Sequence, residues 1–460
     1  MAVVLIIASI AACGRAQHPS QGAVIAPTTT RSASPTVADV IPPVVPVGDF
    51  SAVGQLVNAD ITEHRLPGAV VQIGHGGNVV FREPFGDRKL DGEPGLDGSP
   101  SPAEPMTVDT IFDLASLSKP IATTPAVLQL YEQGRIALDE PVQTYFPEFN
   151  PAGDPRRAQV TIRMLLTHTS GIGGDLSREG PWGLTAADKA DGLRRAMAAS
   201  LEFGPGEGFH YSDTGFIILG ALVEKLTGEP LDVYVQNHVF APLGMLDTHY
   251  LPAAKACGPH RIIGTAISFE TRATVSTPCP DGAWSTELLD RVAPTARDED
   301  TPGINPDFDR PLRGTVHDPT ARRIGGVSGS AGVFSTAADI GKYAQALLDR
   351  RAGRPSRFPL RQSTVELMTT PQQPVSAGTE LRGFGWDIDT SHSRPRGEIF
   401  PVGSFGHVGF TGVSLWIDPG SDSYVIVLAN VIHQRGGPPI VTLAGNIATE
   451  AARALHLYGS

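Results

Sequence analysis

Apolar positions near the two ends of the chain follow the periods of helices and β-strands. Residues 50–61 carry apolar side chains at helical spacing, which predicts a helix. Apolar runs at 69–73 and 79–81 then flank a Gly-Gly turn, which predicts a β-hairpin. Near the C-terminus, two runs around an Asp-Pro-Gly turn predict a second hairpin over 413–428, and 440–457 has the spacing of a closing helix.

The middle of the chain has helical patterns instead. A helix is expected from about Ser116, with Pro125 kinking or breaking it and Gly134 closing its continuation. An apolar stripe over 218–226 predicts another helix, ended by Gly228. Strands at both ends and helices between them predict an α/β (α+β) fold: an antiparallel sheet flanked by helices, with an inserted, mainly helical lobe.

Expected domain boundaries follow from this pattern. Residues 49–460 form one domain of two lobes, which is long enough to bury a large core. The sheet lobe covers about 49–112 and 326–460, and the helical lobe covers about 113–325. Within the helical lobe, the Pro/Gly-rich segment 251–323 has the composition of a loop insertion.

The N-terminal residues have the composition of an export signal. Residues 2–12 are an apolar run too short to span a bilayer, and small residues precede Cys13. This resembles a bacterial lipoprotein signal, in which Cys13 becomes the lipidated first residue of a protein anchored in the cell envelope. No Lys or Arg precedes the run, so an ordinary cleaved signal, with a periplasmic or secreted product, is the alternative. Residues 14–48 are rich in Pro, Ser and Thr and predict an unfolded tether.

Charge and cysteine content narrow the possible partners. The 36 Lys and Arg against 48 Asp and Glu give a net charge of −12 without a basic run, which argues against nucleic acid as a partner. Cys257 and Cys279 form an even pair for a disulfide in an oxidising compartment, although two free thiols remain the alternative. The 13 histidines show no metal-binding motif, so neither a metal nor a cofactor is expected. The oligomeric state stays open.

The candidate chemistry begins at Ser116-Leu117-Ser118-Lys119. On a helix, positions three apart share one face, so the Lys119 amine can reach the Ser116 hydroxyl. Serine is a weak nucleophile and needs a group that takes its proton. Lys119 could do so only with a lowered pKa; if it stays charged, it could instead hold Tyr211 as a phenolate. The alternatives without catalysis are that Ser116 only begins a helix beside a solvated Lys119, and that Tyr211 is a half-buried aromatic residue.

Three motifs in this order carry a family resemblance. Ser116-x-x-Lys119, Tyr211-x-Asp213 and His407-x-Gly409 resemble the signature motifs of the serine β-lactamase and penicillin-binding-protein superfamily, closest to its class C-like branch with related esterases and periplasmic serine hydrolases. The similarity covers roughly residues 50–457 and implies an acyl-enzyme mechanism with a cleft between two lobes. It also implies that the backbone amides of Ser116 and Phe410 form the oxyanion hole and that Tyr211 is the general base.

Two residues depart from the pattern of penicillin-recognising members. Asp213 stands where Asn is usual, and an ionised Asp only accepts hydrogen bonds; it could equally be the N-cap of the next helix. His407 stands where a β-lactamase typically has Lys, and histidine is mostly neutral near pH 7. His407 is expected to line the cleft. The alternative is a histidine that faces solvent on its strand. His168 is expected to be structural, and His317-Asp318 is a weaker candidate for substrate contact.

These departures favour an esterase-like serine hydrolase acting on carboxylic esters or related acyl compounds. A glutamate-driven deacylation of the class A type is not expected, because its sequence pattern is missing. One alternative keeps the chemistry with a β-lactam or a peptidoglycan stem as substrate, as in a β-lactamase or D,D-peptidase. The other is an envelope binding or sensor protein that acylates without turnover. Small-molecule esters, amides or β-lactams are therefore the expected partners.

Overall fold

The computed structural model describes residues 43–45, 47–96, 98–255, 261–263, 266–268 and 288–460. The chain divides into two compact units, Met1–Ile41 and Pro42–Ser460, and the described residues all belong to the second. Cys13, Cys257, Cys279 and nearly all of the expected leader and tether lie outside the described residues. Among the described helices, none is both long and apolar enough to cross a membrane.

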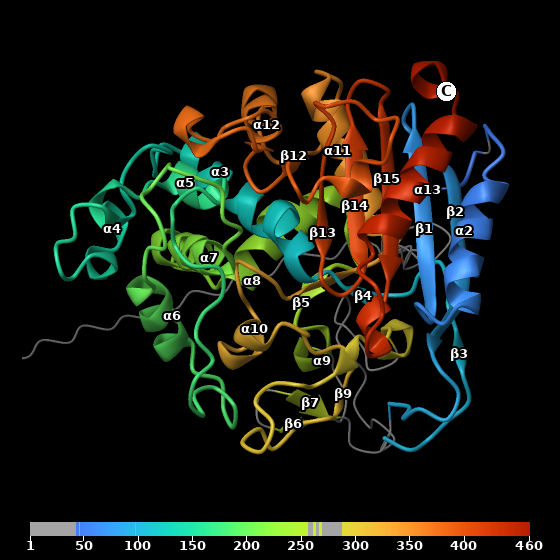
Figure 1. Ribbon diagram of the computed structural model, residues 1–460, viewed down its shortest axis with the longest axis horizontal. Coiled ribbons are helices and arrows are strands. Elements are labelled where there is room, and N and C mark those ends of the chain that lie inside the picture. Colours follow the sequence, from blue (N-terminus) through green and yellow to red (C-terminus); the bar gives the residue numbers. More distant parts are fainter. Residues whose placement is uncertain (1–42, 46, 97, 256–260, 264–265, 269–287) are drawn as a thin grey trace, which may run out of the picture. The chain divides into compact units, whose positions relative to one another are not determined.

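An eight-stranded sheet forms the centre of the second unit, in the order β11-β12-β13-β14-β15-β1-β2-β3. Its neighbouring strands pair antiparallel. The strands are β1 (Gly68–His75), β2 (Asn78–Lys89), β3 (Glu104–Pro105), β11 (Leu381–Arg382), β12 (Asp387–Asp389), β13 (Phe405–Gly409), β14 (Val413–Asp418) and β15 (Ser423–Ala429). Both expected hairpins are present, as β1–β2 and β14–β15. The pairing of β1 with β15 places the two ends of the domain side by side (Figure 1).

Helices cover both faces of this sheet. Helices α2 (Ser51–Thr62) and α13 (Val441–Ala454) pack on one face, and α11 (Ala337–Arg351) packs on the other (Figure 1). Strand β1 is buried on both faces because its side chains alternate: Val71 joins the core under α2 and α13, whereas Val70 joins the core under α11. The sequence prediction of an antiparallel sheet flanked by helices is confirmed.

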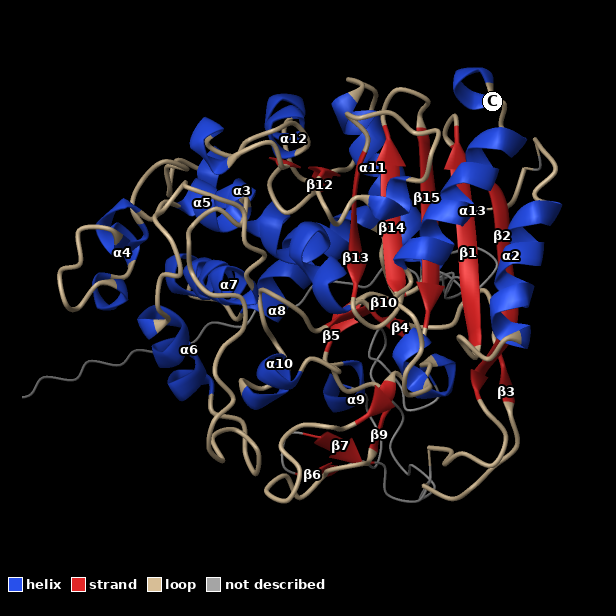
Figure 2. Cartoon of the chain, in the orientation of Figure 1, coloured by secondary structure: helices blue, strands red, loops and turns tan. Residues whose placement is uncertain are grey.

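The remaining helices gather on the β13 side of the sheet (Figure 2). They are α3 (Thr124–Glu132), α4 (Val142–Tyr145), α5 (Ile162–Leu166), α6 (Lys189–Ala198), α7 (Asp213–Thr227), α8 (Leu231–Val235), α9 (Pro252–Lys255), α10 (Pro319–Arg323) and α12 (Gln362–Met368). Short strands β4 (Phe112–Asp113), β10 (Val333–Ser335) and β5 (His249–Tyr250) form a second sheet. The pairs β6 (Arg261–Ile263) with β7 (Ala266–Ser268) and β8 (Ala296–Arg297) with β9 (Pro311–Leu312) complete the strands.

The expected break near Pro125 has an unusual form. Residues Lys119–Thr123 make a π-helical turn, and Pro125 lies in the first turn of α3 that follows. The Thr124 N–H donates to the Lys119 carbonyl oxygen, so the helical backbone runs from this turn into α3 without a gap. At the other predicted stop, Gly228 ends α7 in the left-handed conformation with φ 78°. The expected break at Pro125 is therefore a local π-helical turn just before the proline, and the helix continues through it.

Strand β13 lies against the turn that carries Ser116. A Cβ atom on Gly409 would come within 2.4 Å of the carbonyl oxygen of Leu114, so glycine is needed for this approach. Next to it, the Thr411 hydroxyl donates a hydrogen bond of 2.7 Å to the carbonyl oxygen of Asp113. The end of β13 and the Ser116 turn are thus held together at backbone distance.

We expect Gly409→Ala to lower the free energy of unfolding by about 1–3 kcal/mol, because the methyl group must push β13 away from Leu114. Gly54→Ala is the matched control: its nearest neighbour would be a Phe85 ring atom at 3.5 Å, and alanine within α2 should add about 0.5–1 kcal/mol. Urea unfolding measures both. Equal stability of the Gly409 variant and the wild type would contradict the close approach.

Candidate active site

Ser116 lies on a tight turn directly after β4. The residue before it, Ala115, has φ 43°, a conformation that costs a residue with a Cβ about 1–3 kcal/mol and recurs at functional sites. The Asp113 carboxylate compensates by accepting hydrogen bonds from the Ala115 N–H at 2.9 Å and from the His317 N–H at 2.6 Å. Burial outweighs these bonds and raises the pKa of Asp113 to about 6. Asp113 therefore clamps the Ser116 turn.

Lys119 is fully buried beneath Ser116, and its ammonium group has three acceptors. It donates 2.9 Å hydrogen bonds to the Ser116 hydroxyl and to the carbonyl oxygen of Ser330, and it forms an ion pair with Asp213. An ammonium group has three N–H donors, so all of them are used. The sequence expectation that Lys119 reaches Ser116 is confirmed.

The ion pair decides the protonation state of Lys119. Burial by itself would lower its pKa, but the Asp213 carboxylate and the Tyr211 hydroxyl outweigh burial and raise the pKa to about 12. Lys119 is therefore charged at neutral pH. The lowered pKa that Lys119 would need to act as the general base is therefore not present in this resting site.

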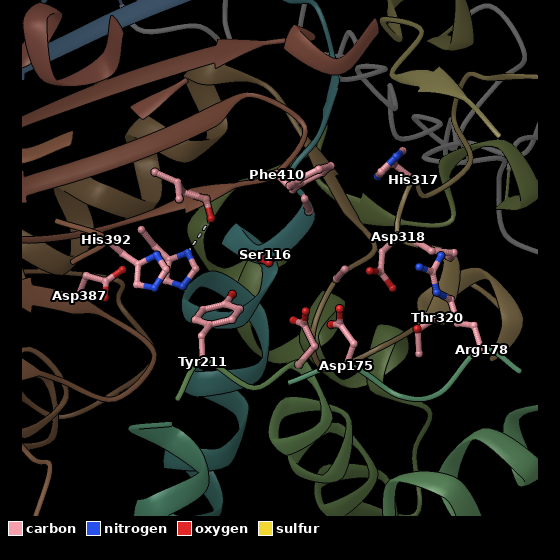
Figure 3. A pocket seen from close by; sticks show the side chains of 16 residues that line it. Ser116, Asp175, Arg178, Tyr211, His317, Asp318, Thr320, Asp387, His392 and Phe410 are labelled. Atoms are coloured by element: carbon pink, nitrogen blue, oxygen red, sulfur yellow. Dashed lines mark hydrogen bonds between the residues drawn. The ribbon is translucent and has the colours of Figure 1, made fainter. Parts of the chain in front are cut away.

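The Tyr211 hydroxyl points toward Ser116 in the cavity (Figure 3). Its ring centre is 5.0 Å from the Lys119 ammonium, and its buried hydroxyl is close enough to Lys119 and Ser116 for both to act on its pKa, although it makes no hydrogen bond of standard geometry among the described residues. Burial raises the pKa of Tyr211, and the Lys119 charge opposes this only in part. Tyr211 is thus a neutral phenol at rest, which corrects the expectation that Lys119 holds it as a phenolate.

Asp213 is the first residue of α7 and not its cap. The N-cap is Ser212, whose hydroxyl accepts a hydrogen bond from the Gly215 N–H. The N-cap alternative for Asp213 is therefore wrong, and its carboxylate faces Lys119 instead. Beside it lies the Asp175 carboxyl, whose pKa is raised by burial and by the neighbouring Asp213 charge.

His407 is a neutral group on the cavity wall, with only 2% of its surface exposed. Its Nδ1 lies 2.7 Å from the carbonyl oxygen of Val408, which fixes the proton on Nδ1. Its Nε2 is buried and unpartnered within the described part of the chain. Burial lowers the pKa of His407 to about 3, so no positive charge stands where the resemblance would place a lysine.

A cavity of about 410 Å³ brings the predicted residues together (Figure 3). Ser116, Tyr211, Asp213, His407 and Phe410 line it. The Phe410 ring is 73% exposed and stacks on His317, with ring centres 5.7 Å apart. The oxyanion role of the Phe410 and Ser116 amides stays a prediction.

His168 lies outside the cavity lining and supports Tyr211. Its ring stacks on the Tyr211 ring at 4.4 Å, and its Nδ1 accepts a hydrogen bond from the Ser212 N–H at 3.0 Å. Burial holds its pKa well below the usual value. This agrees with the structural role expected from the sequence.

Sequence reasoning missed several residues that line the cavity. They are Asp175, Arg178, Thr320, Asp387 and His392. Most of them lie in irregular segments, where neither period nor motif marks them. His317 and Asp318, the weaker candidates, do line the cavity. Thr320 lies two residues after Asp318, and this proximity is the sequence feature that could have pointed to it. Among the described residues, no cluster of three or more His, Cys, Asp or Glu could hold a metal ion.

Comparison with known proteins identifies the family. Residues 53–439 match the family model described as Beta-lactamase. The chain belongs to this family. It is a β-lactamase-family serine hydrolase, as the sequence motifs predicted.

Relatives and solved structures agree with this assignment. An N-acetylmuramyl-L-alanine amidase of Bacillus subtilis strain 168 is 30% identical over 83% of this chain and 80% of its own. A protein of Escherichia coli strain K12, provisionally named a D-alanyl-D-alanine carboxypeptidase, is 29% identical over 78% of this chain and 77% of its own. Simvastatin synthase (LovD) of Aspergillus terreus shares the fold with a TM-score of 0.62 and 20% identity, covering 90% of this chain and 100% of its own.

Replacing Asp213 by Asn should make the site work at lower pH. The Lys119 pKa should fall because the Asp213 charge no longer opposes its burial, and the Tyr211 pKa should fall because a nearby negative charge is lost. With Tyr211 as the base, we expect the rising limb of the kcat/KM profile to move down by about one pH unit. The profile is measured with a p-nitrophenyl ester.

Asp91→Asn, which removes an exposed carboxylate in the β2–β3 connection, is the control for the change in net charge. An unmoved limb in Asp213→Asn would contradict the assignment of Asp213 as the group that holds the Lys119 proton.

Proposed function

We propose that this β-lactamase-family hydrolase is esterase-like and acts on carboxylic esters or related acyl compounds. The carrying observation is that a neutral histidine, His407, occupies the wall position where the resemblance places a lysine for a substrate carboxylate. Arg178 also lines the cavity, and its guanidinium lies 3.7 Å from the Asp300 carboxylate, which Arg323 binds at 2.8 Å. β-Lactams and peptidoglycan stems both carry a carboxylate beside the scissile amide, which needs such a charge.

The proposed reaction proceeds through an acyl-enzyme. Ser116 attacks the carbonyl carbon and Tyr211 takes its proton, while Lys119 supplies the positive charge next to both oxygens. The backbone amides of Ser116 and Phe410 bind the oxyanion of the tetrahedral intermediate. Tyr211 then protonates the leaving alcohol, and it deprotonates the water that releases the acid. Because Tyr211 is a neutral phenol at rest, the cycle begins when the phenol proton passes to solvent water in the cavity, which leaves a phenolate beside the Lys119 charge.

We expect Ser116→Ala to reduce turnover of a short-chain p-nitrophenyl ester by about 10³-fold or more, because the acyl acceptor is gone. The protein is produced from residue 46 onward, and fluorophosphonate labelling is followed by mass spectrometry. Ser118→Ala is the control within the same motif: Ser118 is buried, and its hydroxyl accepts a hydrogen bond from the Val333 N–H. It should retain labelling. Normal turnover by Ser116→Ala would overturn the assignment.

A second candidate function rests on the names of the relatives. Both curated relatives reported above are named for peptidoglycan-type amide substrates. Release of D-alanine from a pentapeptide stem, or steady hydrolysis of a chromogenic cephalosporin, at rates above those of the esters would favour this candidate. A stable acyl adduct without turnover of any substrate would favour the binding or sensor alternative.

We further propose that the protein is exported and anchored to the membrane by a lipid on Cys13. The support is the apolar run that ends directly before this cysteine. In a bacterial host, Cys13→Ala should move the protein from the membrane fraction to the soluble fraction and abolish fatty-acid labelling. A mature N-terminus other than Cys13, found by mass spectrometry of the wild type, would contradict the anchor.

A further inference from the structure

The cavity wall carries more acidic than basic side chains. Four carboxylates line it, at Asp175, Asp213, Asp318 and Asp387, against one guanidinium at Arg178. Three of these five groups have their own partners: Asp213 pairs with Lys119, Asp387 pairs with Arg382, and Arg178 pairs with Asp300. Asp175 and Asp318 have no cationic partner within 4.0 Å among the residues that the structure describes, although Asp175 shares a side-chain hydrogen bond with Asp213.

These two carboxylates lie on one side of Ser116, whereas His392 and Asp387 lie on the other (Figure 3). Asp318 accepts a hydrogen bond of 2.6 Å from the Ala321 N–H through one oxygen, at the start of α10. Burial, followed by the Asp213 charge, raises the pKa of Asp318 to about 6, and both causes raise that of Asp175 as well. Above the pKa values of these groups, the cavity wall concentrates negative charge beside the nucleophile.

An independent feature of the same cavity also calls for a hydrogen-bond donor. The ring of His407 is almost fully buried, with its proton fixed on Nδ1 by the Val408 carbonyl. Its unpartnered Nε2 therefore carries a lone pair and can only accept. A buried acceptor without a partner is unfavourable, and a donor from a bound molecule would satisfy it.

We propose that the acyl substrates of this enzyme carry an ammonium group, which Asp175 and Asp318 bind. The inference rests on the proposed esterase-like function and names its substrate class: amino-acyl esters in preference to neutral or anionic ones. The ammonium group supplies positive charge to a wall whose carboxylates outnumber its guanidinium, and the N–H donors that carboxylates bind most strongly. The cavity of about 410 Å³ suits a small acyl group of this kind.

Three isosteric p-nitrophenyl esters test this inference. The esters of alanine, isobutyrate and methylmalonate place an ammonium, a methyl and a carboxylate at the same position, so they differ mainly in charge. The kcat/KM of each ester is divided by the rate constant for its hydrolysis by hydroxide, which removes differences in intrinsic reactivity. Both enantiomers of the alanine ester are used. We expect the corrected ratio of alanine to isobutyrate to be about tenfold or more for one enantiomer, and the methylmalonate ester to be the slowest.

Variants that each remove one carboxylate test whether Asp175 and Asp318 cause the preference for the alanine ester. Asp318→Asn keeps a side chain that can cap α10, and it should reduce the alanine-to-isobutyrate ratio about tenfold. Asp175→Asn should reduce it several-fold, because Asp175 is more exposed. The ratio is taken within each variant, so a general loss of activity or of folded protein cancels. Asp91→Asn should leave the ratio as in the wild type. A ratio near one, or a ratio that neither cavity variant changes, would overturn the inference.

Binding of boronic acids separates this inference from the proposed function. 1-Aminoethylboronic acid and isopropylboronic acid are the boronates that correspond to alanine and isobutyrate, and they bind a nucleophilic serine without turnover. Tighter binding of the amino form without ester hydrolysis would sink the esterase proposal and keep the ammonium site. Ester hydrolysis with equal binding of the two boronates would do the reverse.

Discussion

The buried ammonium group of Lys119 is the constraint on which the site depends. A charge without access to water is tolerated only when each of its donors has an acceptor. The three acceptors come from three parts of the chain: Ser116 after β4, Ser330 before β10, and Asp213 at the start of α7. The helical segments, the small sheet and the Ser116 turn must therefore assemble together, because a missing acceptor would leave a buried charge unsatisfied.

The local elements and the reactive residues could be predicted because their signals are short-range. The spacing of apolar residues, the turn residues and the helix-ending glycines locate α2, α7 and both hairpins. The three motifs locate Ser116, Tyr211 and His407. The π-helical turn at Lys119–Thr123 left no such signal. Ser330 contributes a backbone carbonyl, which any residue type could supply, so its position in the sequence says nothing about its role.

Asp213 shows why the rest could not be predicted. Ser212 and Asp213 are both good helix caps, and the sequence cannot choose between them. The choice is made in three dimensions, where the Lys119 ammonium attracts the carboxylate and leaves Ser212 to cap α7. Likewise, Asp175 and Asp318 meet Asp213 only because an irregular segment and the start of α10 reach the same cavity. Contacts between charged residues that lie far apart in the chain leave no periodic pattern in the sequence.

The two departures from the penicillin-recognising pattern change the cavity in the same direction. A neutral His407 removes a positive charge from β13, and Asp213 adds a negative charge at α7. Either change alone would weaken the attraction of the site for a carboxylate. Together they leave the charge of Lys119 as the one that stabilises negative charge near Ser116, and Asp213 already offsets it. The site therefore has less to offer an anionic substrate, whereas Asp175 and Asp318, which have no cationic partner within 4.0 Å among the described residues, favour the proposed ammonium group. Selectivity here follows from the balance of charge around one lysine more than from the shape of the cavity.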